Sequence, residues 1–240
     1  MGILKDKVIL ITGGSSGIGK STAQLVAAEG AVVVIGDIQD KEGNDAASEI
    51  VKNGHQASYL RMDVTDFESV KQVTEEVSSR HGRLDGAFNN AGIEGPTAKI
   101  SEYENLDWKK VLDVNLTGVY NCIKCQIDEM RKQAGGGSIV STSSAAGLIG
   151  IPGASGYNSA KHGVIGLSKT IALEYASQNI RVNAVCPGFI ETPMLERVTD
   201  ASIKIREQLI KMVPMKRVAK PSEIADAVAW LLSDRSTYVT

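Results

Sequence analysis

The sequence predicts a doubly wound α/β domain, in which helices cover both faces of one parallel sheet. Short apolar runs alternate with helical stretches along most of the 240-residue chain. Several of these runs, including 8–11 and 32–35, are apolar at every position, which is typical of strands buried on both faces. The first four runs begin about 25 residues apart, which leaves room for one crossover helix between parallel strands.

The predicted elements follow this alternation along the chain. The final helix begins at Pro221, because proline suits the first turn of a helix and Ile224, Val228 and Leu231 recur at helical spacing. No proline- or serine-rich linker divides the chain, so residues 1–240 are expected to form a single domain. The strands are expected at residues 7–12, 31–36, 56–61, 84–88, 137–141 and 180–185.

The composition excludes several classes of protein. A net charge of −2 provides no basic surface for a nucleic acid or an anionic membrane. No apolar run approaches the ~20 residues of a membrane-spanning helix, and the first run has the length of a strand rather than of a signal sequence. Three cysteines make no disulfide framework, so a cytoplasmic location is expected. Cys122 and Cys125 form a C-x-x-C pair without a second ligand pair, and no metal is expected.

A glycine-rich loop from Thr12 to Gly19 follows the first predicted strand and opens the first helix. Backbone N–H groups and the positive helix end at such a junction bind phosphate groups. The glycine spacing differs from the G-x-G-x-x-G fingerprint, so the loop alone does not identify a dinucleotide site. Asp37 closes the second strand about 18 residues after Gly19, where a dinucleotide site places an acid on the adenosine ribose.

The same loop also fits a different reaction class. Residues 14–21 satisfy the P-loop pattern G-x-x-x-x-G-K-[ST] of nucleotide triphosphatases, with Lys20 and Ser21 in the last two places. The strand that ends at Asp37 could then help to hold magnesium. This phosphoryl-transfer alternative leaves the Tyr157–Lys161 pair unexplained, so it is the more remote hypothesis.

Tyr157 and Lys161 are the most informative pair in the chain. Four residues apart on a predicted helix, they lie on one face about one turn apart. A free tyrosine has a pKa near ~10, and a neighbouring ammonium group stabilises the phenolate and lowers that pKa. The phenol then becomes a usable acid or base for an alcohol or ketone.

Together these motifs resemble those of the short-chain dehydrogenase/reductase family, in its compact single-domain branch, over nearly the whole chain. The resemblance implies a Rossmann fold and hydride transfer between a nicotinamide and a secondary alcohol or its ketone. The motifs that carry it are T-G-x-x-x-G-I-G at 12–19, N-N-A-G at 89–92, Val-Asn at 114–115, S-A-A-G at 144–147, Y-x-x-x-K at 157–161 and Pro-Gly at 187–188.

The resemblance implies catalytic roles for four residues. Tyr157 would exchange a proton with the substrate oxygen, and Lys161 would hold the nicotinamide ribose and lower the tyrosine pKa. Ser144, and not its neighbour Ser143, would hydrogen-bond the substrate oxygen, because the family serine stands three residues before a glycine. Asn115 would support a water that links Lys161 to solvent.

NAD is the expected cofactor. Asp37 would accept hydrogen bonds from the ribose diol and repel a 2′-phosphate. Relatives that prefer NADP tend to carry a basic residue where this chain has Ser16 or Ile38. Asp63 and Val64 resemble the family's adenine contact, although a helix N-cap is an equally common role for such an acid. The expected cofactor contacts are Gly13, Ser15, Ser16, Gly17, Ile18, Gly19, Asp37, Ile38, Asp63, Val64, Asn90, Ala91, Gly92, Tyr157, Lys161, Pro187, Gly188, Ile190 and Thr192.

Residues 190–216 occupy the place of the family's substrate lid. Phe189, Met194, Leu195 and Leu148 could wall an apolar pocket, which favours a nonpolar or cyclic secondary alcohol and its ketone. Polyols, steroids and acyl thioesters remain open as substrates. Glu94 could reach a substrate hydroxyl, but a solvated surface acid is the expected role.

Two further expectations concern the whole molecule. A homotetramer is expected from the resemblance. Family members usually continue past a Tyr-Val-Thr like that at 238–240 into a last strand. Either the natural chain continues past Thr240 or it lacks that strand, and in the second case one sheet edge is left bare. The alternative function is a protein that binds NAD without turnover, as a sensor or scaffold. The presence of the serine, tyrosine, lysine and asparagine of the resemblance makes an enzyme the better hypothesis.

Overall fold

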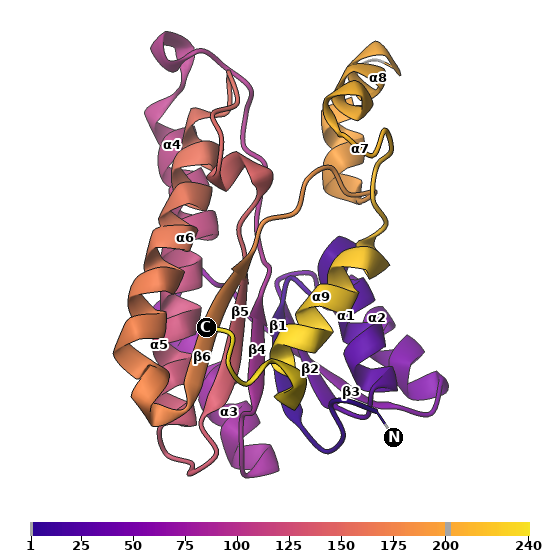
Figure 1. Ribbon diagram of the computed structural model, residues 1–240, viewed down its shortest axis with the longest axis vertical. Helices are drawn as coiled ribbons and strands as arrows, with labels where there is room; N and C mark the ends of the chain where they lie inside the picture. The colour runs from indigo at the N-terminus through magenta and orange to yellow at the C-terminus, as the bar shows by residue number, and fades with distance from the viewer. Residues whose placement is uncertain (1, 200–202) are drawn as a thin grey trace.

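The computed structural model describes residues 2–199 and 203–240. It contains a six-stranded sheet in the order β3-β2-β1-β4-β5-β6, in which every neighbouring pair is parallel. The strand order reverses between β1 and β4, as in a doubly wound fold. Helices cover both faces of this sheet (Figure 1), so the predicted fold class is confirmed.

The strands lie close to their predicted positions. All of β1 and all but the first residue of β2 are buried, as the continuous apolar runs indicate. The largest shift is in β4, which begins at Gly86 although the Asp85 amide already donates to the Val8 carbonyl at 2.9 Å. The strands are β1 (Val8–Thr12), β2 (Val32–Asp37), β3 (Gln56–Arg61), β4 (Gly86–Asn89), β5 (Gly137–Thr142) and β6 (Ile180–Val185).

Two helical layers bury the two faces of the sheet. Ile9 packs into a core cluster with one layer, and the next residue, Leu10, packs into the cluster of the other, because successive strand residues point to opposite faces. The first layer consists of α1 (Gly17–Ala28), α2 (Asp40–Lys52) and α9 (Pro221–Leu232). The second consists of α3 (Phe67–His81), α5 (Gly118–Met130) and α6 (Ser155–Tyr175).

One helix of the second layer is irregular. A shorter helix, α4 (Asn105–Leu112), continues into α5 through a π-helical turn at Asp113–Thr117. Such turns inside α-helices are frequent at functional sites. This turn contains Asn115, whose side chain is fully buried.

The predicted lid segment stands apart from both layers. Its helices, α7 (Pro193–Thr199) and α8 (Ile203–Met212), lie beyond the end of the sheet, across from α4 (Figure 1). A β-bridge between Ile190 and Ala219 joins the two ends of the segment, and the Glu191 amide donates to the Ala219 carbonyl at 2.9 Å. The two ends of this segment therefore join the rest of the protein side by side.

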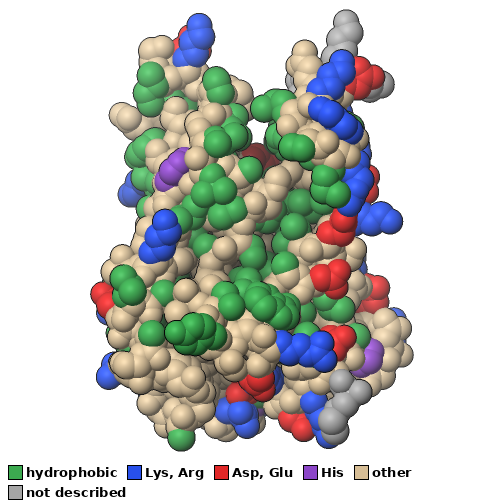
Figure 2. Space-filling view, viewed as in Figure 1, with side chains coloured by type: hydrophobic (Ala, Val, Ile, Leu, Met, Phe, Trp, Pro, Cys, Tyr) green, Lys and Arg blue, Asp and Glu red, His purple; other side chains and the backbone are tan. Residues whose placement is uncertain are grey.

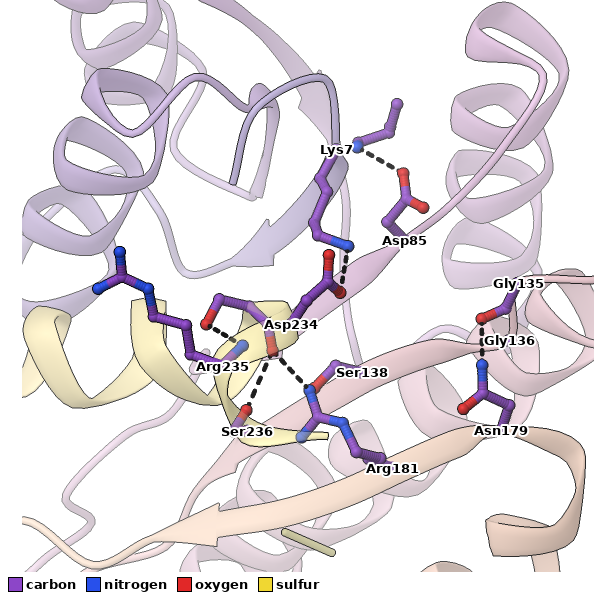
Figure 3. A network of polar contacts seen from close by, with 12 residues as sticks. Lys7, Asp85, Gly135, Gly136, Ser138, Asn179, Arg181, Asp234, Arg235 and Ser236 are labelled. Atoms are coloured by element: carbon purple, nitrogen blue, oxygen red, sulfur yellow. Dashed lines mark hydrogen bonds and ion pairs between the residues drawn. The ribbon is translucent and has the colours of Figure 1, made fainter. Parts of the chain in front are cut away.

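The C-terminal residues contact β6, the outermost strand. The Val182 amide donates to the Thr240 hydroxyl oxygen at 3.0 Å. Arg181 extends from the same strand toward the turn that contains Asp234 and Ser236 (Figure 3). Within the described residues β6 has a strand on one side only, and these contacts satisfy part of its free edge. The carbonyl groups that accept from Arg181 are those of Leu231, Ser233 and Val239.

Candidate active site

The four predicted catalytic residues gather at the carboxyl end of β5. Ser144 follows this strand directly, and the Lys161 ammonium group donates to the Thr142 carbonyl at 2.8 Å. The same ammonium nitrogen lies 5.5 Å from the centre of the Tyr157 ring. A Cβ at Gly92 would lie 2.7 Å from the Asn115 Oδ1 and 3.6 Å from the Lys161 Nζ, so glycine is needed where the loop after β4 passes between them.

Lys161 is a buried cation, because only 2% of the residue is exposed. Burial disfavours the charged form and lowers the pKa of Lys161 to about 8. The group therefore stays mostly protonated at pH 7. One of its three N–H bonds is directed to the Thr142 carbonyl, which leaves donors for a ribose or a water.

The phenol of Tyr157 has a shifted pKa. Burial raises the pKa of Tyr157, and the negative charge of Glu94 adds to the rise, whereas the Ser144 hydroxyl lowers it. Burial of the phenol is the dominant effect, and the Lys161 ammonium group is bonded to the β5 carbonyl. The lowering of this pKa by Lys161 stays a prediction.

The two neighbouring serines have different surroundings. The Ser143 hydroxyl is buried and donates to the Lys161 carbonyl at 2.8 Å, so it fastens α6 to the end of β5. The Ser144 hydroxyl is half-buried, accepts from the Ala146 amide at 3.1 Å and interacts with Tyr157. This geometry agrees with the choice of Ser144 as the residue that faces the substrate oxygen.

Asn115 binds the backbone rather than another side chain. Its Nδ2 donates to the Ile93 carbonyl at 2.9 Å and to the Val111 carbonyl at 3.0 Å, and its Oδ1 accepts from the Ile93 amide at 3.2 Å. Both side-chain N–H groups are therefore used. A water linked to Lys161 would have to bond a group other than these two donors.

The glycine loop is packed too closely for side chains at two positions. Gly13 has a φ of +64°, and a Cβ there would lie 2.8 Å from the Ala91 Cα. A Cβ at Gly19 would lie 2.1 Å from the Gly13 oxygen. The Thr12 hydroxyl accepts from the amides of Asn90 and Ala91, at 3.0 and 3.2 Å, which joins the loop to the N-N-A-G turn.

Asp37 lies at the end of β2 as predicted and is 7% exposed. Its carboxylate accepts hydrogen bonds from the amide and hydroxyl of Ser15, at 3.2 and 2.5 Å, and from the Gln39 amide at 3.1 Å. A carboxylate has about four acceptor positions, so about one remains for a ligand. The residues present fit an adenosine ribose next to a phosphate-binding loop, and Asp37 also holds that loop in place.

A basic residue near this acid was not predicted. Arg61 donates to the Ile38 carbonyl at 2.8 Å and forms an ion pair with Asp40 at 2.9 Å. The parallel register places Arg61 opposite Asp37, so the in-register pairing of the second and third strands would have revealed it. The local charge near Asp37 therefore includes that of Arg61, although positions 16 and 38 carry no basic residue.

Asp63 is not a helix N-cap. Its carboxylate accepts from the amide and hydroxyl of Thr65, at 2.9 and 2.7 Å, in a turn before α3. The cap of α3 is Asp66, which accepts from the Glu68 amide. Val64 is buried beside α5, where its carbonyl accepts from Asn121 at 3.0 Å.

The segment after β6 meets both halves of the site. The Pro187 carbonyl accepts from the Ala145 amide at 2.8 Å, which joins it to the turn that carries Ser144. A Cβ at Gly17 would lie 3.2 Å from the Thr192 Cγ2, so the base of the lid segment lies beside the start of α1. Gly188 has no atom within 4 Å of a Cβ position and borders open space.

Glu94 is not the solvated surface acid that was expected. Its side chain is 28% exposed and accepts from two nitrogens of Arg197 on α7, Nε at 2.7 Å and Nη2 at 3.2 Å. This pairing lowers the pKa of Glu94. Nothing in the sequence predicts this ion pair, because the two residues are far apart in the chain.

Lys20 argues against the P-loop alternative. Its ammonium group forms an ion pair with Glu49 of α2 at 2.7 Å, outside the loop that it would have to complete.

No group of three His, Cys, Asp or Glu side chains in the described ranges could hold a metal ion. Cys122 and Cys125 lie buried in α5, where burial raises the pKa of both thiols. None of the helices in the described part of the chain has the length and apolarity to cross a bilayer.

Comparison with known proteins agrees with the fold. A family model described as "Enoyl-(Acyl carrier protein) reductase" matches residues 13–240. The 2,5-dichloro-2,5-cyclohexadiene-1,4-diol dehydrogenase of Sphingobium indicum is 40% identical over all of this chain and 95% of its own. The 3-oxoacyl-[acyl-carrier-protein] reductase FabG of Thermotoga maritima is 44% identical over 99% of this chain and 94% of its own.

Solved structures give the same result. The crystal structure of levodione reductase superimposes with a TM-score of 0.95 at 39% identity, over 98% of this chain and 94% of that one. That of NAD⁺-bound xylitol dehydrogenase gives 0.94 at 34% identity, over 99% and 96%. This chain therefore belongs to the short-chain dehydrogenase/reductase family and is an oxidoreductase with a Rossmann fold.

Proposed function

We propose that this protein is an NAD-dependent dehydrogenase that transfers hydride between the nicotinamide and a secondary alcohol or its ketone. One arrangement carries the proposal: the buried ammonium group of Lys161 lies beside the Tyr157 ring, and Ser144, directly after β5, lowers the pKa of the same phenol. The N-N-A-G turn joins these groups to the glycine loop. Gly92 lies beside Lys161, and the amides of Asn90 and Ala91 donate to the Thr12 hydroxyl. Hydrogen-bond donors and a proton-transfer group therefore converge on one position for a substrate oxygen.

The residues of the chain would then divide the chemistry. Bound nicotinamide supplies the hydride acceptor in oxidation and the hydride donor in reduction. In oxidation, the Tyr157 phenolate takes the proton of the substrate hydroxyl while Ser144 donates a hydrogen bond to the same oxygen. In reduction, the phenol returns the proton to that oxygen. Lys161 holds the ribose hydroxyls with its free N–H groups and returns protons from solvent to the phenol.

NAD is proposed over NADP because of the charge at the end of β2. Asp37 is buried beside the glycine loop, and a 2′-phosphate would bring two further negative charges toward it. The Arg61 guanidinium is already paired with Asp40. The related xylitol dehydrogenase was solved with NAD⁺ bound, which supports the same choice.

The proposed substrate is a ring that carries the reacting alcohol or ketone. A dehydrogenase of a cyclohexadiene diol is a relative at 40% identity, and levodione reductase has a similar structure. The surface is notched beside the lid segment, and hydrophobic side chains lie on both sides of the notch (Figure 2). Such a surface suits an apolar ring. A 3-oxoacyl thioester is the competing substrate, because a reductase of that class is 44% identical.

The test is the absorbance of reduced nicotinamide with a panel of cyclic alcohols, acyclic polyols and a 3-oxoacyl thioester. NAD and NADP are each used in parallel. We expect turnover of cyclic alcohols with NAD and a loss of about 10²–10⁴-fold in kcat in Tyr157→Phe, with NADH binding retained. A Tyr157→Phe variant as fast as the parent would overturn the mechanism. NADH binding without any turnover across the panel would favour the sensor alternative. The expected homotetramer and cytoplasmic location stay predictions.

A further inference from the structure

An ion pair spans from the catalytic loop to the lid segment. Glu94 lies two residues after Gly92, in the loop that follows β4, and Arg197 lies on α7. The contact is bidentate: the Nε of Arg197 donates to one carboxylate oxygen of Glu94, and its Nη2 donates to the other. Bidentate contacts of this kind are the stronger and more directional ion pairs. In the described residues no other ion pair joins this loop to α7 or α8.

The backbone that carries Glu94 is fixed from the opposite side. Both polar groups of the Ile93 backbone bond to the Asn115 side chain in the π-turn. Gly95 has a φ of +70°, and a Cβ there would lie 2.5 Å from a methyl group of Val111, so it packs directly on α4. The carboxylate of Glu94 is therefore presented from a rigid base, whereas Arg197 belongs to a segment attached at one place.

The same loop borders the catalytic lysine. A Cβ at Gly92, two residues before Glu94, would lie 3.6 Å from the Lys161 Nζ. The loop that carries Glu94 therefore packs against a catalytic residue and is also joined to α7 by the ion pair.

We propose that Glu94 and Arg197 form a latch that holds α7 over bound substrate. When α7 lies in place, Arg197 pairs with a carboxylate on the fixed loop beside the catalytic residues. When α7 moves away, this ion pair is broken and the site is open. Glu94 and Arg197 are thus positioning residues, since they act through α7. This inference rests on the proposed function and extends it to the lid.

The strength of the pair suits a latch that opens in each catalytic cycle. The Arg197 side chain is 58% exposed, and ion pairs with such exposure contribute little to stability. Its loss would therefore change the closed population by up to about fivefold rather than abolish closure. We expect KM to rise by about that factor in both Glu94→Gln and Arg197→Met, with a smaller change in kcat.

Rescue by a second cation distinguishes the latch from simple packing. Arg197→Lys keeps a positive charge that can pair with Glu94 and should restore most of the parent KM, whereas Arg197→Met should not. The double variant Glu94→Gln/Arg197→Met should raise KM no further than either single variant, because both changes remove the same contact.

Arg206→Met is the matched control, because Arg206 pairs with Glu191 at 3.2 Å within the lid segment and does not contact Glu94. It should leave KM at the parent value. A KM like that of the parent in Glu94→Gln or Arg197→Met, or rises in KM that add up in the double variant, overturn the latch.

Hydrogen exchange over residues 193–199 tests the latch without substrate turnover. Faster exchange in both variants supports the latch, and unchanged exchange overturns it. This readout keeps the latch testable if the parent enzyme turns over none of the substrates, in which case the proposed function fails separately.

Discussion

Asn115 satisfies both polar groups of the Ile93 backbone, with contacts of 3.2 Å to its amide and 2.9 Å to its carbonyl. A regular helix would place this side chain differently, and the π-turn at Asp113–Thr117 brings it against the loop after β4. The loop carries Gly92 on one side of Ile93 and Glu94 on the other. One side chain therefore fixes the loop that borders Lys161 and the lid latch.

Asn115→Leu should impair catalysis by releasing this loop. Two backbone groups of Ile93 would lose their partners in a buried place, which costs about 1–3 kcal/mol per group left unsatisfied. We expect kcat/KM to fall by at least about tenfold and the melting temperature to drop by several degrees. Steady-state kinetics well below the melting temperature separate the two effects. A variant with parent kinetics and reduced stability would confine Asn115 to a structural role.

Ser144→Ala should reduce kcat by about 10²–10³-fold, the usual effect of removing one donor to a reacting oxygen. Ser143→Ala is the matched control, since its hydroxyl donates to the Lys161 carbonyl instead. We expect the control to lose about 1 kcal/mol of stability with little change in kcat. Single-turnover kinetics and thermal melts of both variants provide the comparison. Equal losses of kcat in the two variants would show that the serines share the role.

The sheet was predictable from the sequence because its central strands are buried on both faces. Continuous apolar runs such as 32–35 have few interpretations in a chain of this length, and their spacing implies crossover helices. The six strand positions followed from this pattern, and the start of the last helix followed from Pro221. The π-turn did not, because nothing in the residues around Asn115 distinguishes it from a regular helix.

The site was predictable only where short motifs mark it. Asn115, Ser144, Tyr157 and Lys161 do gather, but the environment of the phenol depends on burial and on Glu94, which no motif reveals. Glu94 meets Arg197 across 103 residues of sequence. Contacts between such distant residues follow from how the lid segment folds back, and single-sequence patterns carry little information on that.

Lys161→Met should abolish activity while changing the pH dependence of stability. The folded-state pKa of Lys161, about 8, lies below its ordinary value of 10.5. Between these two values the unfolded chain binds more protons than the folded one, so the parent gains stability as the pH rises through this window. Methionine has no such dependence.

The stability of the variant relative to the parent should therefore be highest at pH 7. This pH lies below the folded-state pKa of Lys161, where the buried cation destabilises the parent most. The lost bond to the Thr142 carbonyl acts against the variant equally at all pH values. We expect the difference in melting temperature, variant minus parent, to fall by several degrees from pH 7 to pH 10. A constant difference would mean that Lys161 is not destabilised by burial.

Asp37→Ala should shift the cofactor preference toward NADP. The change removes the charge that would repel a 2′-phosphate, and it also removes the acceptor of the Ser15 amide and hydroxyl. We expect kcat/KM for NAD to fall and the ratio of NADP to NAD efficiency to rise by at least about tenfold. Arg61 lies opposite position 37 in the sheet register and donates to the Ile38 carbonyl, so it is the cation available to the phosphate.

The double variant Asp37→Ala/Arg61→Met tests this assignment. It should lose most of the gain with NADP while its efficiency with NAD stays that of Asp37→Ala, because the guanidinium would contact only the 2′-phosphate. Initial rates at a saturating alcohol concentration give kcat/KM of both variants for NAD and for NADP. A parent enzyme that already prefers NADP would overturn the role of Asp37, and would place the Arg61 charge above the carboxylate in deciding which dinucleotide binds.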